Sequence, residues 1–138
     1  MDKSTTGAGR IGSVHLAVLV ALLVAPGIAG VRFTGKSGIW LLVGWTALAS
    51  GLTYLFYGID KRRARAGGWR EPEAMLHLCE LAGGWPGAFL AQQRLRHKCS
   101  KLGYQFVFWF IVAVHQFVAV DYLLGWRMIR ALIAAVKN

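Results

Sequence analysis

The sequence has few prolines and few cysteines, and each shortage excludes a class of protein. Three prolines in 138 residues, with no low-complexity run, argue against a long disordered tail. Two cysteines, Cys79 and Cys99, are too few for a disulfide framework, so we expect free thiols. Since no repeat at solenoid periods is present either, the length predicts a single domain over residues 1–138.

Charge is almost absent from three long apolar stretches, 13–31, 39–57 and 104–124, the last of which holds Asp121 near its end. The chain is 56% hydrophobic, with a mean hydropathy of +0.46. Each stretch is long enough to cross roughly 30 Å of hydrocarbon as a helix. The first also has the design of a cleaved signal peptide, but we expect it to be a retained span. These stretches predict an all-α integral membrane protein with three transmembrane helices.

A fourth apolar segment, residues 74–93, is interrupted by Glu80 and by a glycine-rich motif. The motif is Gly83, Gly84, Trp85, Pro86 and Gly87. A regular helix does not run through such a motif, so the segment either crosses with a break or turns back. Turning back puts the cationic blocks 58–73 and 94–101 on one side, which the positive-inside rule favours. We therefore predict a cytoplasmic N-terminus, a re-entrant or broken helix pair at 74–93, and an amphipathic C-terminal helix at 126–138.

A series of short polar motifs runs from Asp60 to about Phe110. In order, they are Asp60-Lys61, Trp69-Arg70-x-Pro72-Glu73, Leu76-His77, Gly83-Gly84-Trp85-Pro86-Gly87-Ala88 and Arg96-His97-Lys98-x-x-Lys101, followed by Phe106 and Trp109. Their order and spacing resemble the bacterial Domain of Unknown Function 1294 family. The resemblance implies a small membrane protein without an assigned activity, here placed in the bacterial inner membrane with several passes. It covers a little over a third of the chain.

The charged motifs form the candidate site at the predicted cytoplasmic face. The candidate anion- or lipid-binding residues are Lys61, Arg70, Arg96, His97, Lys98 and Lys101, and the structural polar motif adds Asp60, Glu73, His77 and the glycine-rich break. Arginine forks, lysine charges and backbone N–H groups freed at the break suit a phosphate or carboxylate. Alternatively, the same charges pair with one another and with anionic lipid, and so only determine the topology. Both interpretations stay open from the sequence.

The sequence offers weaker support for a metal site, a haem cofactor or an enzyme. Two His-x-Cys pairs, at His77 and His97, do not place their side chains on one helix face, so we expect no metal. His15 and His115 lie at different depths, which argues against haem, and we expect no cofactor. No nucleophile elbow, P-loop or zincin motif is present. If the protein were an enzyme, His77 and His97 would be the acid–base pair acting on a lipid phosphate.

The function predicted from these patterns is that of a non-catalytic membrane component. It would bind anionic lipid, or an acidic partner subunit, at its cytoplasmic face. Small residues in the second span, Gly44, Ala47, Ser50 and Gly51, would let another helix approach closely. Ordinary packing explains them most simply, and association in a larger complex or a homo-oligomer is the alternative. The alternatives are a lipid-phosphate enzyme, or a small transporter or channel component with His115 and Glu80 along a polar path. Anionic lipid explains the net charge of +10 better than direct nucleic-acid binding does, because the cations border membrane spans.

Overall fold

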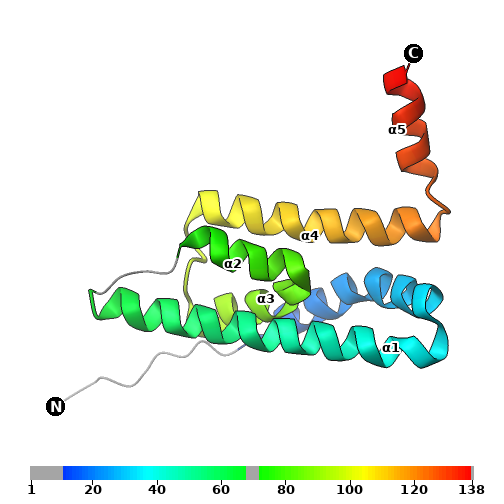
Figure 1. Cartoon of the computed structure of the whole chain (residues 1–138). Helices are drawn as coiled ribbons and strands as arrows, with labels where there is room; N and C mark the ends of the chain where they lie inside the picture. The colour runs from blue at the N-terminus through cyan, green and yellow to red at the C-terminus, as the bar shows by residue number, and fades with distance from the viewer. Residues whose placement is uncertain (1–10, 68–71, 138) are drawn as a thin grey trace.

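The computed structural model describes residues 11–67 and 72–137, and within these ranges the only regular structure is helix (Figure 1). In chain order the elements are α1 (Ser13–Arg65), α2 (Glu73–Cys79), the π-helical turn η1 (Glu80–Gly84), α3 (Trp85–Leu95), α4 (Leu102–Leu123) and α5 (Arg127–Lys137). The predicted all-α class is confirmed.

Helix α1 consists of two helices joined at Gly35, where φ is 67° and ψ is −176°. Only glycine adopts that conformation without strain, so the chain reverses there. The two parts, Ser13–Gly35 and Ser37–Arg65, and helix α4 are long and apolar enough to cross a membrane. Three candidate spans were predicted, but the second continues beyond the expected end at residue 57. Residues 61–65, Lys-Arg-Arg-Ala-Arg, are good helix formers, and cations are favourable at a helix C-terminus.

The predicted break in segment 74–93 is confirmed. Gly83 has a φ of 104° within η1, and helices α2 and α3 on either side of it form a hairpin. The indole N–H of Trp45 donates to the Ala82 carbonyl at the break, over 2.9 Å. The start of α2 and the end of α3 lie at the same end of the bundle, because Lys101, just after α3, contacts Glu73 at 2.8 Å. The chain therefore turns back at the break.

The hairpin packs closely against the second half of α1. A Cβ atom added at Gly87 would lie 2.0 Å from the Ser50 carbonyl oxygen, and one at Gly84 would lie 2.1 Å from Oγ1 of Thr53. Glycine is therefore required at both positions for the helices to approach. The small residues of the second span were expected to admit another helix. Ser50 does so, whereas a Cβ at Gly44 or Gly51 would meet nothing within 4 Å.

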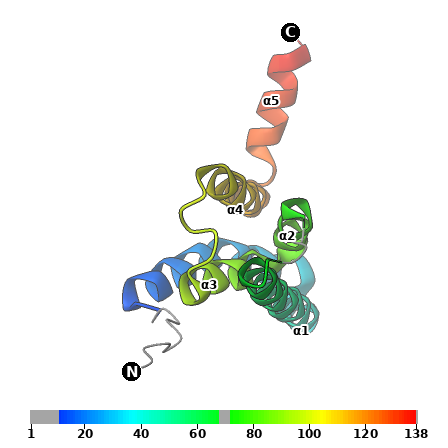
Figure 2. The same cartoon turned by 90° about the vertical axis from the view of Figure 1, so that its left-hand side faces the viewer.

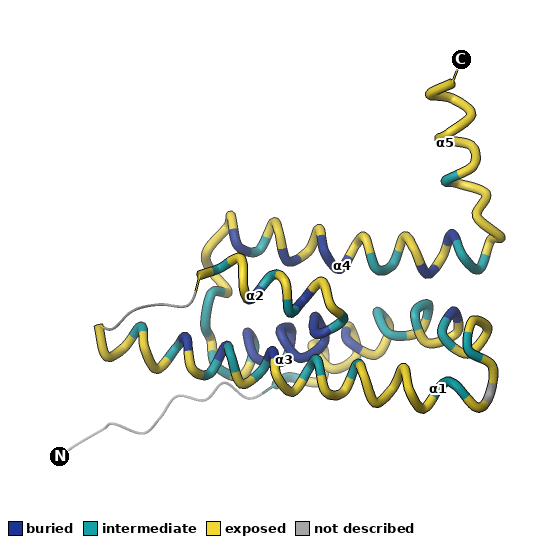
Figure 3. The backbone as a smooth tube through the Cα atoms, in the orientation of Figure 1, coloured by how far each residue is buried: buried dark blue, intermediate teal, exposed yellow. Residues whose placement is uncertain are grey.

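The buried core lies around this hairpin and not along the whole bundle (Figure 3). Its members are Leu19, Tyr57, Leu76, Trp85, Ala88, Phe89, Ala91, Tyr104, Phe108 and Val112. Elsewhere the three candidate spans expose large apolar side chains, such as Leu41 and Phe106. Such exposure is typical of helices that face lipid.

Two details tie the remaining helices together. Pro26 lacks the N–H that would bond to the Leu22 carbonyl one turn earlier, and the Gln116 amide of α4 donates to that carbonyl instead, at 2.7 Å. At the end of α4, the buried carboxylate of Asp121 accepts the backbone N–H groups of Met128 and Ile129, at 2.7 and 3.2 Å. Asp121 thus satisfies the first turn of α5 and holds the turn between α4 and α5.

The two ends of the bundle differ, and we name them here. The arginine-rich end contains the last turns of α1 and α3 and the first turns of α2 and α4. The elbow end contains the bend at Gly35 and the turn between α4 and α5. Figures 1 and 2 show α5 projecting away from the bundle at the elbow end, and none of its residues is buried.

Candidate functional site

Glu80 is the centre of a buried polar network at the arginine-rich end. It is fully buried within η1, because the hairpin carries it between α1 and α4. One carboxylate oxygen accepts the hydroxyls of Tyr57 and Tyr104, at 2.7 and 2.8 Å. The other accepts the Nδ1–H of His77 at 2.7 Å. The His77 ring also stacks on Tyr104, with centroids 4.2 Å apart. Glu80 therefore joins three helices through hydrogen bonds that are strong in a dry interior.

Two glutamines extend this network toward the loop after α3. The Gln92 amide donates to the Tyr57 hydroxyl at 3.0 Å, and the Gln105 amide donates to the Gln92 side-chain oxygen at 2.6 Å. Gln105 also donates to the Lys98 carbonyl at 3.0 Å. The loop is tied once more by Cys99, whose thiol donates to the Gln92 carbonyl at 3.0 Å. These bonds satisfy groups left open at the C-terminus of α3.

A second cluster surrounds Asp60, which is 1% exposed. One of its oxygens accepts from Nε2 of His97 at 2.7 Å and lies 3.2 Å from Nζ of Lys98. The other oxygen, Oδ1, is buried and has no hydrogen-bond partner. Lys98 also lies 4.8 Å from the ring centroid of Tyr104, so it connects this cluster to the Glu80 network.

Glu73, at the start of α2, pairs with the same loop. It accepts from Lys101 at 2.8 Å and lies 3.5 Å from Lys98. The hydrogen bond from Lys101, opposed in part by burial and aided by the charge of Lys98, holds the pKa of Glu73 below its ordinary value. The predicted cations of this loop are thus engaged with acids of the same chain.

The structure separates the predicted anion-binding residues into three groups. His97, Lys98 and Lys101 form the ion pairs above, and the Lys61 amine donates to the Leu95 carbonyl. Arg96 is exposed, in the left-handed conformation that ends α3. Arg70 lies outside the described residues. The interpretation that these charges pair with one another therefore holds for His97, Lys98 and Lys101, whereas Arg96 is exposed.

Four members of the network were not identified from the sequence: Tyr57, Gln92, Tyr104 and Gln105. The tyrosines sit near the ends of apolar stretches, where an interfacial position explains them as well as a buried one does. The available signal for a buried polar network was the presence of Gln92 and Gln105 within apolar segments, because buried amides need hydrogen-bond partners. His115 is not part of this network. Its Nδ1–H donates to the Ile111 carbonyl at 2.9 Å, and its ring lies beside Trp85.

Residues 50–104 match the family described as "Protein of unknown function (DUF1294)". This match confirms the resemblance over the matched segment. It contains both tyrosines, the hairpin, Asp60 and the loop with His97 and Lys98, so nearly the whole polar network lies within it. No curated protein and no solved structure matches the chain.

Proposed function

We propose that this is a non-catalytic membrane component whose arginine-rich end binds the headgroups of anionic lipids. The observation that carries the proposal is that the acids at this end are paired with inner cations, whereas the arginines around them are exposed. The acids Asp60 and Glu73 are paired inside the molecule with the cations of the loop after α3. The outer arginines Arg62, Arg65, Arg94 and Arg96 are exposed around them.

The position of these arginines supports lipid as the ligand. Arg62 and Arg65 are in the last turn of α1, and Arg94 is in the last turn of α3. In a helix that crosses a membrane, these turns lie at the level of the headgroups. A guanidinium binds a phosphodiester through two parallel hydrogen bonds, and each cation near an anionic surface contributes about 1 kcal/mol.

We infer the topology from the same charges. The arginine-rich end faces the cytoplasm, the N-terminus lies on that side, and the hairpin of α2 and α3 enters the membrane and returns. Both cationic loops then share one aqueous side, in agreement with the positive-inside rule. The broken backbone at the tip of the hairpin is acceptable at membrane depth because Trp45 satisfies the Ala82 carbonyl and the chain is buried by protein from Gly84 onward.

The test replaces Arg62, Arg65, Arg94 and Arg96 together by glutamine, and in a matched control by lysine. In native mass spectrometry after release from mixed phosphatidylglycerol and phosphatidylcholine, we expect the native protein to retain the anionic lipid preferentially. We expect the glutamine variant to lose this preference at least about tenfold, since four cations near the surface are removed. The lysine variant keeps the charge and should retain part of the preference for the anionic lipid. An unchanged preference in the glutamine variant rejects the proposal.

A second candidate function, a lipid-phosphate enzyme, is favoured by one observation. His77 and His97 each hydrogen-bond to a carboxylate, Glu80 and Asp60 respectively, which is how enzymes orient a histidine for proton transfer. It stands second because both oxygens of Glu80 are already bonded within the network. Phosphate release from a lipid phosphate monoester, abolished by His77→Ala or His97→Ala, would favour it over lipid binding. No release by the native protein excludes it.

A further inference from the structure

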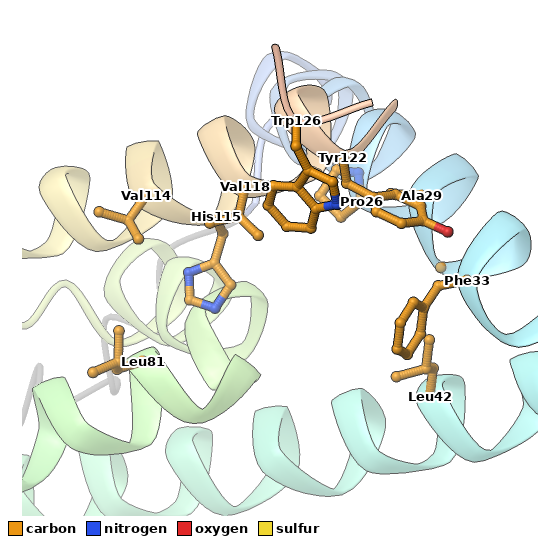
Figure 4. A pocket seen from close by; sticks show the side chains of 12 residues that line it. Pro26, Ala29, Phe33, Leu42, Leu81, Val114, His115, Val118, Tyr122 and Trp126 are labelled. Carbon is orange, nitrogen blue, oxygen red and sulfur yellow. The ribbon is translucent and has the colours of Figure 1, made fainter. Parts of the chain in front are cut away.

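The elbow end holds a cavity of about 530 Å³ that the polar network does not reach (Figure 4). It lies between both halves of α1, η1 and α4, and it extends to the turn before α5. Its wall is largely apolar, with Pro26, Phe33, Leu42 and Val118 among the lining residues. A neighbouring cavity of about 510 Å³ shares Pro26, Leu42 and His115 with it. The volume is that of an ordinary small-molecule site.

His115 supplies a hydrogen-bond acceptor to this cavity. Figure 4 shows its ring directed from α4 toward the space between Leu81 and Val118. Nδ1 lies 2.9 Å from the Ile111 carbonyl, and a carbonyl only accepts, so Nδ1 carries the proton. In the neutral ring Nε2 then has a lone pair. Among the described residues, no protein group donates to Nε2.

We propose that this cavity binds a neutral apolar molecule whose hydroxyl group donates a hydrogen bond to Nε2 of His115. The inference does not depend on lipid binding at the other end of the bundle. An acceptor facing an apolar cavity without a donor is unfavourable, and an acyl chain filling the space offers none. A charged ammonium donor would lose its hydration in such a cavity, so the donor is a neutral one.

The aromatic side chains indicate the shape of the ligand. Phe33 and Tyr122 meet edge to face with centroids 5.9 Å apart, and Tyr122 contacts Trp126 in the same way at 5.8 Å. All three line the cavity on the side of the elbow. Rings in such a wall favour a ligand with a flat ring body, since offset and edge contacts between rings are attractive. A phenol with an apolar substituent combines this body with the required donor.

The experiment compares 4-octylphenol with 4-octylanisole, its methyl ether, which has the same body and no donor. Equilibrium binding is measured to the full chain in lipid nanodiscs, with binding to empty nanodiscs subtracted. We expect the native protein to bind the phenol about fivefold more tightly than the ether, the ratio that one neutral hydrogen bond of about 1 kcal/mol gives. His115→Phe removes the acceptor and should bind both compounds equally. The control His15→Phe alters an exposed histidine outside the cavity and should keep the preference.

A second measurement needs no variant to fold. In the native protein with ¹⁵N-labelled histidine, the phenol should shift the resonance of one unprotonated ring nitrogen, and the ether should not. Equal affinities for the two compounds, a preference that survives His115→Phe, or no binding above empty nanodiscs would each overturn the proposal.

Discussion

The two ends of this bundle use polar residues in opposite ways. At the arginine-rich end the hairpin fills the space between α1 and α4, and its polar groups bond to one another: Glu80 to two tyrosines and a histidine, Asp60 to His97 and Lys98. At the elbow end no hairpin fills the space, a cavity remains, and His115 directs an acceptor into it. Where the hairpin fills the bundle, the polar residues of the apolar helices form one structural network. At the elbow end Gln116 and Asp121 also bond within the protein, and His115 differs from them because its Nε2 faces the cavity.

The strongest test of packing at the arginine-rich end is Gly87→Ala. The new Cβ would lie 2.0 Å from the Ser50 carbonyl oxygen, so α3 must move away from α1. We expect the free energy of unfolding to fall by about 3 kcal/mol, as for overpacked cores. Unfolding in mixed micelles measures it. The control is Gly51→Ala, where a Cβ meets nothing within 4 Å, and it should be neutral or slightly stabilising. Equal effects would refute the close approach.

Glu80→Ala tests whether the buried network stabilises the arginine-rich end. The substitution leaves the hydroxyls of Tyr57 and Tyr104 and the ring N–H of His77 without their acceptor. We expect a loss of about 2–3 kcal/mol in the same unfolding measurement, the cost of leaving buried donors unsatisfied. Glu80→Gln keeps one acceptor oxygen and should lose less. If the alanine and glutamine variants were equally stable, the hydrogen bonds to Glu80 would contribute nothing.

At the elbow end, a double-mutant cycle isolates the hydrogen bond from Gln116 to the Leu22 carbonyl. Gln116→Leu should cost about 1 kcal/mol, because it leaves the Leu22 carbonyl without a donor. In the Pro26→Ala background, a helical N–H at residue 26 can reach that carbonyl, so Gln116→Leu should then cost close to nothing. The unfolding free energies of the four proteins give the coupling. A cost of Gln116→Leu that is independent of residue 26 would show that Gln116 acts elsewhere.

The smallest effect concerns Glu73. Its pKa is lowered from an ordinary value of 4.5, chiefly by the hydrogen bond from Lys101, so its ionised form is favoured in the folded state. The stabilisation is therefore present at neutral pH and disappears as the pH falls from about 4.5 through the lowered pKa. Thermal midpoints of the native protein and Glu73→Gln should differ slightly at pH 7 and converge in acid. A difference that grows in acid has the wrong sign for this pair.

The candidate site was only partly predictable. The charged residues that surround it were identified, and so was the alternative that they pair with one another. The choice between pairing and ligand binding could not be predicted, because it depends on which acid contacts which cation. His97 and Asp60 are separated by 37 positions in the chain, and Tyr57 and Tyr104 by 47. Tyr57 and Tyr104 were missed because a tyrosine near the end of an apolar stretch has the same pattern whether it lies at an interface or in a core.

The sequence by itself determined the three apolar helices and the break at Gly83. These follow from local properties: runs of apolar side chains, and a backbone conformation that only glycine adopts easily. Only the tertiary structure decided that the inner charges are paired, that Gln116 replaces the donor missing at Pro26, and that His115 faces a cavity. Those contacts join residues far apart in the chain, and each depends on how closely the helices approach and which faces they turn toward one another.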